Sequence, residues 1–348
     1  MMAVESLAAP DERLYDEFLA RHAEATLYHS LRYRDLLLAV AGGEAEYLVA
    51  RGDGRIVGVL PAIARAGSYG RVINSLPFFG SYGGVLSESA EAAAALWAAF
   101  GDRTASAGVA AATVIENPFI DGSAPSATLP ATHGDERIAQ FTPLEPGPSF
   151  RDKLLARIDG SARRNLRKAE LAGIRVVVDN DALGFLERAH GEGMAEIGGT
   201  PKPAAFFAAI RSLLRPEIDY RVYAAKSGGA PVAALLVFYF GRFAEYITPA
   251  TAGGHREQQP MAAILFRALS DAAAEGRGFW NWGGTWLSQT GVYRFKRKWG
   301  AEERRYGYAT ILRDPALLRL SAQELSALYP YFYVLPYSSL HAFGTVAS

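Results

Sequence analysis

The spacing of hydrophobic positions changes along the first part of the chain. Between residues 14 and 38 apolar side chains recur every three to five positions, which predicts two short helices. Residues 47–50 and 55–60 are mostly apolar and flank the turn Arg51-Gly52-Asp53-Gly54, a pattern typical of a β-hairpin. Further predicted elements are strands at 71–76, 83–86 and 111–116, and an Ala-rich helix at 90–108. Helices and strands therefore alternate, which favours an α/β or α+β class.

The second half of the chain repeats this plan. A basic helix is expected at 150–172 and a strand at 174–178, and the order helix, helix, hairpin, strand, helix, strand then returns. These later elements are expected at 182–194, 203–214, 220–225 with 231–239, 243–248, 261–274 and 279–284. We interpret the repetition as a duplicated supersecondary plan. One large irregular α+β domain is the alternative.

A boundary between two domains is expected where the composition shifts. Residues 122–148 are rich in Pro, Gly, Ser and Thr, with a strand predicted only around 137–143. The chain has 348 residues, a length that suggests two domains of ordinary size.

Charge and cysteine content narrow the classes of protein. The 36 basic and 36 acidic residues balance, so the chain lacks the overall basic excess of a protein dedicated to coating DNA. With no cysteine, it has no disulfide framework, zinc finger, iron–sulfur cluster or thiol nucleophile. The lack of cysteine agrees with a reducing compartment.

The chain shows no targeting or membrane-spanning segment. Its N-terminal residues lack the basic start and apolar stretch of a signal peptide, and its longest apolar runs fall short of the ~20 residues that a membrane helix needs. We therefore expect a cytoplasmic protein whose membrane contact, where there is any, is peripheral. Residues 325–340 are dense in Tyr, Phe and Pro, which favours a strap packed over a domain surface; an interfacial anchor or a dimer patch is the alternative.

The sequence lacks the motifs of several common enzyme classes. There is no GxxxxGK[ST] phosphate loop, no GxGxxG after a strand and no GxSxG elbow. The six His residues show no HxxxH spacing, so a metal site is not expected.

One candidate constellation is a basic segment. Between residues 151 and 168 seven basic side chains face two acidic ones, a local excess of five. On a helix, Arg163 and Arg167 lie one turn apart, as do Arg164 and Lys168. These like charges repel one another, and a bound anion would relieve the repulsion. The segment is either a solvated helix face or the docking site of a phosphate-bearing partner.

A second constellation lies near the end of the second half. Trp282-Gly283-Gly284 ends a predicted strand where backbone can approach a ligand closely, and Tyr293, Phe295 and Trp299 supply aromatic walls. Lys296 stands among these aromatic residues, where an ammonium could stabilise a developing oxyanion. The alternative is an amphipathic helix whose basic residues are simply solvated.

These residues carry a resemblance to a known family. Trp282-Gly283-Gly284, followed by Tyr293-x-Phe295-Lys296-x-x-Trp299-Gly300, resembles the closing motif of the FemAB-like, or FemX-like, peptidyltransferases. The strand with Tyr246, followed by Thr251, is similar too. The resemblance implies two tandem acetyltransferase-like (GNAT) domains. It places domain 1 at residues 1–143, with 313–348 returning to it, and domain 2 at 144–312.

The resemblance also implies an activity and its residues. The activity is transfer of an aminoacyl group from charged tRNA to an amine of a peptidoglycan precursor, with no cofactor beyond that co-substrate. Lys296 and Phe295 would stand at the reaction centre, with Lys296 stabilising the oxyanion or the departing ribose oxygen. Such a transfer requires no nucleophile from the protein. The further residues implied in substrate binding are Asn117, Arg163, Arg164, Arg167, Lys202, Tyr246, Trp282, Gly283, Gly284 and Tyr293.

Several departures from the family pattern keep alternatives open. Leu37 stands where the family often has a Lys that contacts the acceptor, which points to a different acceptor. Asn117 stands where the family has an acid, so the resemblance does not carry over a carboxylate role at this position. The segment from Arg256 to Met261 lacks the small residues of an [RQ]xxGx[GA] pyrophosphate loop, and Pro260 removes an amide, so ordinary coenzyme A binding is disfavoured. A CoA-dependent N-acyltransferase acting on a sugar or amino acid is one alternative, and a non-catalytic ligand-binding module is another.

Overall fold

The computed structural model describes residues 2–76, 82–120, 129–145, 147 and 149–336. They divide into two compact units. Unit 1 comprises the chain up to Ala139 and again from Arg304, and unit 2 comprises Gln140–Glu303. Two long strands, β9 (His133–Pro143) and β15 (Glu302–Leu312), each begin in one unit and end in the other. The C-terminal part of the chain thus returns to unit 1, as expected for the fold.

Unit 1 combines two groups of strands with three longer helices. One sheet has the order β1-β3-β4-β7, and a second run of strands has the order β15-β8-β6-β5-β2. Strands β6 and β8 are parallel and are connected through α3. The elements are β1 (Ala3–Ser6), α1 (Glu12–Ala20), α2 (Leu31–Ala41), β2 (Glu44–Ala45), β3 (Leu48–Gly52), β4 (Arg55–Leu60), β5 (Ile63–Gly67), β6 (Gly70–Asn74), β7 (Leu86–Ser87), α3 (Ala90–Ala105), β8 (Val109–Ile115), η6 (Pro315–Arg319) and α10 (Ala322–Leu328).

The turn between β3 and β4 shows why the first hairpin could be predicted. Asp53 and Gly54 both have positive φ values, +50° and +77°. Two successive positive φ values are the signature of a type I′ turn, whose twist matches that of the strands it joins. The pair β3–β4 is antiparallel, with Leu48 opposite Leu60.

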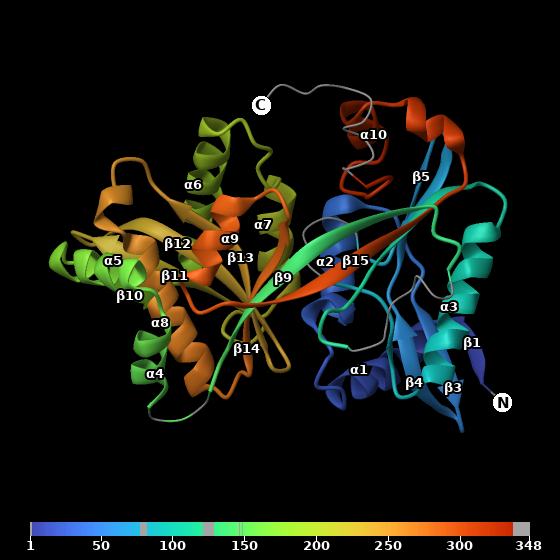
Figure 1. The fold of residues 1–348 in the computed structure, drawn as a ribbon, viewed down its shortest axis with the longest axis horizontal. Helices are drawn as coiled ribbons and strands as arrows, with labels where there is room; N and C mark the ends of the chain where they lie inside the picture. The colour runs from blue at the N-terminus through green and yellow to red at the C-terminus, as the bar shows by residue number, and fades with distance from the viewer. Residues whose placement is uncertain (1, 77–81, 121–128, 146, 148, 337–348) are drawn as a thin grey trace. The chain divides into compact units, whose positions relative to one another are not determined.

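Unit 2 is a three-layer arrangement. Helices α4, α5 and α8 pack on one face of the sheet β10-β11-β12-β13-β14, and α6 and α7 cover the other (Figure 1). All neighbouring strands are antiparallel except β13 and β14, which α8 connects. The elements are α4 (Phe150–Arg157), α5 (Gly160–Leu171), β10 (Arg175–Val178), α6 (Leu183–Glu196), α7 (Ala204–Leu213), β11 (Tyr220–Ser227), β12 (Ala230–Phe240), β13 (Phe243–Thr251), η5 (Arg256–Gln258), α8 (Pro260–Ala274), β14 (Phe279–Trp286) and α9 (Thr290–Arg297).

The two units share the order helix, helix, hairpin, strand, helix, strand, which confirms the duplicated plan. The strand predicted at 83–86 is wrong, since only Leu86 of these residues belongs to a strand, β7, and strand β5 was missed. The single basic helix predicted at 150–172 is wrong as well. Two helices occupy this segment, because Ile158 turns into the core and Asp159 begins α5 by accepting a hydrogen bond from the Ser161 amide at 2.6 Å.

Part of the aromatic C-terminal segment is a packing strap. The Tyr329 hydroxyl donates to the Gly70 carbonyl at 2.9 Å, and the Asn74 side chain exchanges two hydrogen bonds with the backbone of Tyr333 at 2.7 and 2.8 Å. These contacts confirm the strap for residues up to 336, while 337–340 lie outside the described residues. Within the described part of the chain, the helices are all too short or too polar to cross a bilayer.

Candidate active site

The site begins where strands β13 and β14 separate. Their parallel pairing covers only Phe243–Glu245 and Phe279–Asn281. Directly after it β13 has a bulge, since Tyr246 faces Val237 and Thr248 faces Leu236, which leaves Ile247 as the extra residue. A bulge bends its strand and increases the local twist. The two strands therefore form a fork that opens toward their C-terminal ends.

A buried acid and a buried amide stand at the base of this fork. The Asn281 side chain donates to Glu245 Oε2 at 2.7 Å, and Asn281 Oδ1 accepts from the Gly283 amide at 2.9 Å. Both side chains are almost completely buried. Where the backbone pairing between β13 and β14 ends, this side-chain hydrogen bond holds the two strands together. Gly283 has a φ of +74°, a conformation that glycine adopts without strain.

Lys296 extends from α9 into this region. Its Nζ donates to Thr285 Oγ1 at 2.8 Å, to the Gly284 carbonyl at 3.2 Å and to the Gly283 carbonyl at 3.3 Å. All three acceptors are neutral. The side chain is only 4% exposed, and this burial lowers the pKa of Lys296 to about 7. At neutral pH the amine is therefore populated in both its charged and its uncharged form.

Thr285 and Gln140 hold the lysine in place. The Thr285 hydroxyl donates to Gln140 Oε1 at 2.7 Å, so its lone pairs remain available to the Lys296 ammonium. Gln140 Nε2 in turn donates to the Tyr293 carbonyl on α9 at 3.2 Å. These contacts form a closed ring from α9 through β14 and β9 back to α9.

Aromatic side chains line the fork beside Lys296. The Trp282 ring centroid lies 5.1 Å from that of Tyr246 and 6.0 Å from that of Phe295. Trp282 Nε1 donates to Thr142 Oγ1 at 2.9 Å, which fixes the indole. Burial raises the pKa of Tyr246, so its phenol stays neutral. We call Tyr246, Trp282 and Phe295 the aromatic row.

A pocket of about 350 Å³ continues from the Tyr246 end of this row. Helix α6, strand β13, the turn η5 and the first residues of α8 form its walls. The lining residues are Ala189, His190, Gly193, Met194, Tyr246, Pro249, Ala250, Thr251, Arg256 and Met261.

Lys202 lies beside this pocket rather than at Lys296. Its backbone amide donates to His190 Nε2 at 3.2 Å, and its ammonium lies 5.8 Å from the centroid of the Phe206 ring. Burial lowers the pKa of Lys202 to about 8. Burial and the nearby Lys202 charge lower the pKa of His190 to about 4.

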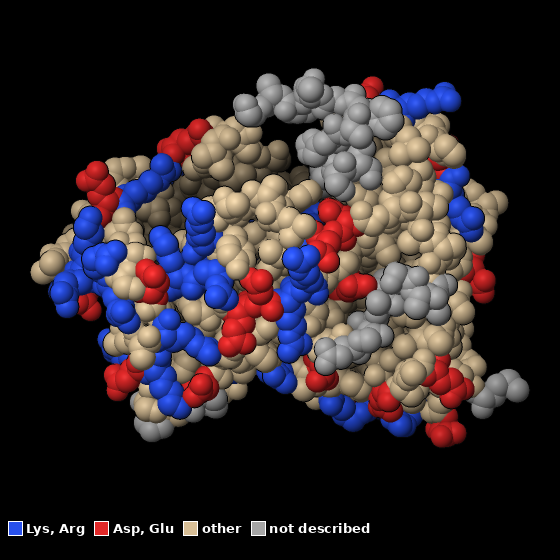
Figure 2. Space-filling view, in the orientation of Figure 1, with Lys and Arg blue, Asp and Glu red and all other residues tan. Residues whose placement is uncertain are grey.

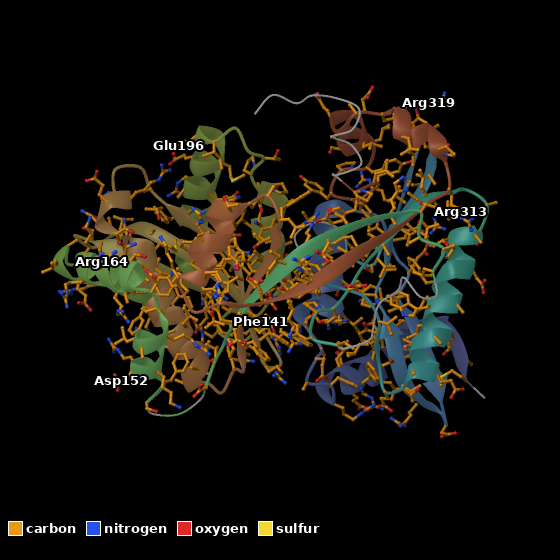
Figure 3. All side chains as sticks on the ribbon, in the orientation of Figure 1. Phe141, Asp152, Arg164, Glu196, Arg313 and Arg319 are labelled. Carbon is orange, nitrogen blue, oxygen red and sulfur yellow. The ribbon has the colours of Figure 1, made fainter. Side chains whose placement is uncertain are left out.

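The arginines of α5 are exposed. Ala162, Leu166 and Ala169 turn toward the core, and Arg163, Arg164 and Arg167 point outward. Figure 3 labels Arg164 on this helix, and Figure 2 shows Lys and Arg side chains crowded over the same part of unit 2. The Asp159 amide donates to the Lys298 carbonyl at 2.8 Å, which ties the start of α5 to the end of α9. The exposed residues Arg163, Arg164, Arg167, Lys168, Arg297 and Lys298 make up what we call the basic face.

Two residues of the sequence prediction have other immediate partners. The Tyr293 hydroxyl donates to Glu303 Oε2 at 2.6 Å, which raises the pKa of the phenol. Asn117 is buried at the end of β8 in unit 1, where its side chain donates to the Glu24 carbonyl at 3.0 Å and accepts from the Phe119 amide at 3.0 Å. The contact with Phe119 forms a local turn, and the contact with Glu24 joins this turn to the segment after α1.

Unit 1 holds a larger cavity, of about 620 Å³, along β9 and β15. Its acidic residues are already engaged. Glu116 accepts from the Gly307 amide at 2.6 Å, Glu136 pairs with Arg305 at 2.5 Å, and Asp135 lies 3.8 Å from Arg137. We assign the candidate site to unit 2, because the desolvated lysine is there.

Sequence reasoning found Lys296 and its neighbours on the chain but missed Gln140, Thr285, Asn281 and Glu245. A usable signal was present for two of them, since Glu245 and Asn281 each interrupt an apolar strand with a polar residue. As for metal binding, the residues described contain no cluster of three or more His, Asp or Glu able to hold an ion.

Residues 157–297 match the family model of an acetyltransferase (GNAT) domain. This segment is a GNAT acyltransferase domain. It contains the fork, the pocket and Lys296, whereas Gln140 and Thr142 on β9 lie outside it. No curated protein matches the sequence.

Solved structures show that the similarity extends beyond the GNAT domain. The structure of FemX has a TM-score of 0.73 at 14% identity, over 91% of this chain and 99% of that one. The C-terminal domain of a protein described as a putative lysylphosphatidylglycerol synthetase from Agrobacterium fabrum has a TM-score of 0.58 at 13% identity, over 94% and 99%. A tandem GNAT protein from the clavulanic acid biosynthesis pathway has a TM-score of 0.50 at 15% identity, over 90% and 99%. The chain thus has a FemX-like tandem GNAT fold.

Proposed function

We propose that this protein transfers an aminoacyl group from charged tRNA to an amine of a cell-envelope precursor. The observation that carries the proposal is Lys296, a desolvated amine held by three neutral acceptors at the fork of a GNAT domain. One of the similar structures is described as part of a putative lysylphosphatidylglycerol synthetase. This description supports the proposal, because lysylphosphatidylglycerol is a membrane lipid that carries an amino acid.

Lys296 can supply the charge that acyl transfer needs. In the transition state negative charge develops on the carbonyl oxygen, and a preorganised donor in a water-poor site stabilises it. The present acceptors of the ammonium are neutral, so an oxyanion would compete for it effectively. The side chain is only 4% exposed, which limits the access of water to it.

The proposed step balances without a nucleophile from the protein. The acceptor amine, as the free base, attacks the ester carbonyl carbon; a C–N bond forms, and the π pair moves onto the oxygen near Lys296. When the intermediate collapses, the C–O bond to the ribose breaks. The surplus proton of the amine passes to the departing ribose oxygen. With a pKa of about 7, Lys296 is suited to carry that proton.

The turn before α8 supports tRNA over coenzyme A as the donor. In this turn the amides of Gln258 and Gln259 donate to the carbonyls of His255 and Arg256 at 3.1 Å, and Pro260 has no amide hydrogen. The Ala262 amide donates to the Gln259 carbonyl at 3.0 Å. Three of the backbone amides in this segment are thus already used within the protein, and Pro260 supplies none for a pyrophosphate.

Lys296→Ala tests the role of the lysine. We expect the transfer rate to fall by roughly 10²–10³-fold, the usual cost of removing one oxyanion donor. Lys153→Ala is the matched control, because it removes an exposed lysine of unit 2 that lies outside both the site and the basic face. The measurement is mass spectrometry of the protein with charged total tRNA, an acyl-CoA panel and a pool of envelope precursors, looking for a donor-dependent mass increment on an acceptor.

Each outcome of this assay is informative. Product from acyl-CoA alone would favour a CoA-dependent N-acyltransferase. Ligand binding without a covalent product from any donor would favour a binding module. A folded Lys296→Ala variant with the wild-type rate would remove Lys296 from the mechanism. Unchanged circular dichroism and thermal midpoint verify that the variant is folded.

A further inference from the structure

The 350 Å³ pocket in the GNAT domain has no role in the step described above. Apolar groups make up most of its wall: the side chains of Met194 and Met261, the Tyr246 ring, Pro249 and two alanines. Methionine side chains adapt to irregular shapes, so such a wall accommodates apolar groups of several kinds.

The polar groups at the pocket are largely neutralised. Arg256 forms an ion pair with Glu196. His190 accepts a hydrogen bond from the Lys202 amide through Nε2, and its low pKa leaves the ring uncharged. The pocket wall therefore consists mainly of neutral and apolar groups, with the Lys202 ammonium near His190 at one side.

The aromatic row links this pocket to Lys296. Tyr246 belongs both to the pocket wall and to the row, its ring 5.1 Å from that of Trp282, and Trp282 contacts Phe295, the neighbour of Lys296 on the chain. The row thus connects the pocket wall at Tyr246 to the segment of α9 that carries Lys296.

We propose that the pocket receives the apolar substituent of the transferred group, so that donors with a side chain of the size of Leu, Met or Phe are preferred over glycyl, alanyl or acetyl donors. This inference rests on the transferase function proposed above. A volume of about 350 Å³ is at the lower end for a whole small-molecule site, which suits one substituent better than a complete coenzyme.

Two glycines of α6 provide a matched test. A Cβ at Gly193 or at Gly191 would have no heavy atom within 4 Å, and both residues are helical, so larger side chains fit the backbone at either position. Only Gly193 lines the pocket. Gly193→Phe should fill the pocket, and Gly191→Phe should leave it open. Met261→Ala, which enlarges the pocket, is a second and independent variant.

Calorimetry with non-reactive donor analogues measures the preference. One series consists of 3′-aminoacylamido adenosines that carry glycyl, leucyl or phenylalanyl groups; the other consists of CoA thioethers with methyl or isopentyl groups. For the wild-type protein we expect the leucyl compound to bind at least about 10-fold more tightly than the glycyl compound, since single methylenes in such pockets are worth about 10–200-fold. Gly193→Phe should bring this ratio close to one, while the glycyl affinity stays within about twofold.

The remaining outcomes decide between this inference and the proposed function. The inference is overturned if small and large substituents bind with equal affinity in both series, or if no probe binds. It is also overturned if Gly193→Phe weakens the binding of the glycyl and leucyl compounds to the same extent. A leucyl preference that Gly193→Phe removes, without product from any natural donor, would keep the pocket assignment and refute the transferase. Selectivity in only one series identifies the donor as tRNA-like or CoA-like. Met261→Ala should shift the preference toward phenylalanyl.

Discussion

Lys296 differs from the other basic residues of its segment in its solvation. Arg294, Arg297 and Lys298 are exposed, whereas Lys296 is 4% exposed and has only neutral partners for its charge. A buried amine without a counter-ion loses hydration and regains only part of it through hydrogen bonds. Folding therefore lowers its proton affinity, and the same effect gives it a pKa near the pH of the cell.

This desolvation should be measurable as a pH-dependent stability. The folded pKa of Lys296, about 7, lies below the unfolded value of about 10.4. Between these values the unfolded chain binds more protons, so the free energy of unfolding should rise with pH. Lys202, with a pKa of about 8, acts in the same direction. Lys296→Met should reduce the rise by about 1.4 kcal/mol per pH unit between about pH 7.5 and 9, as measured by urea denaturation.

The upper limit of this pH window comes from the tyrosines. Burial raises the pKa of Tyr246 and Tyr306, so unfolding becomes more favourable once unfolded tyrosines ionise near about pH 10. A Lys296→Met variant with the same slope as wild type across the window would contradict the assignment of a low pKa to Lys296.

At the level of elements, the fork depends on pairs of residues that are far apart in the sequence. Gln140 on β9 meets Thr285 on β14, and Glu245 on β13 meets Asn281 on β14. The local motif around Lys296 could be predicted because its residues are neighbours on the chain. The polar partners in the fork could not be predicted in this way. They meet only through the register of the strands, and the sequence does not reveal that register.

Helix boundaries and short strands limited the sequence prediction in a different way. The basic run hid the break at Ile158, although Asp159-Gly160-Ser161 is a recognisable helix start. Strand β5 was missed because it follows β4 after only two residues, so the two strands appear as one apolar run. The duplicated order of elements survived these errors, since it depends on the type of each element and not on its ends.

Thr285→Val tests the support that β14 gives to the lysine. The change removes the hydroxyl between Lys296 and Gln140 but keeps the shape of the side chain. Because that hydroxyl accepts a hydrogen bond from the ammonium, its loss should lower the pKa of Lys296 further. NMR titration of ¹⁵N-labelled lysine should show this shift, and the transfer rate at neutral pH should fall about tenfold.

A control variant separates this effect from a general loss of structure. Thr290→Val changes an exposed residue at the start of α9 and should leave both the titration and the rate unchanged. An unaltered Lys296 titration in Thr285→Val would show that the hydroxyl does not hold the ammonium.

At the scale of the whole molecule, the net charge is zero but the basic residues are unevenly distributed. The basic face gathers six exposed cations on α5 and at the end of α9 within unit 2. Their mutual repulsion weakens the isolated protein slightly, and a polyanion would remove it. The basic face thus supports charged tRNA as the donor proposed above.

Charge reversal tests this role of the basic face. The triple variant Arg163→Glu, Arg164→Glu and Arg167→Glu should weaken binding of charged tRNA at least about 10-fold and reduce the slope of log K against log salt by about one for each phosphate that the protein no longer neutralises. Filter binding at several salt concentrations measures both. Reversal of Arg13, Arg55 and Arg319, three exposed arginines of unit 1, is the control with the same change in net charge. Equal weakening in the two triple variants would show that only net charge matters.

The path of the chain through unit 1 has a consequence for how the protein is made. Strand β8 pairs with β15 through residues 111–115 and 308–312, so this edge of unit 1 stays unpaired until residues 308–312 have left the ribosome. Unit 2 is continuous in sequence and is synthesised in that interval. Unpaired strand edges recruit other chains. We expect premature termination anywhere between residues 140 and 303 to yield aggregating fragments, and nascent chains to require protection of β8 during translation.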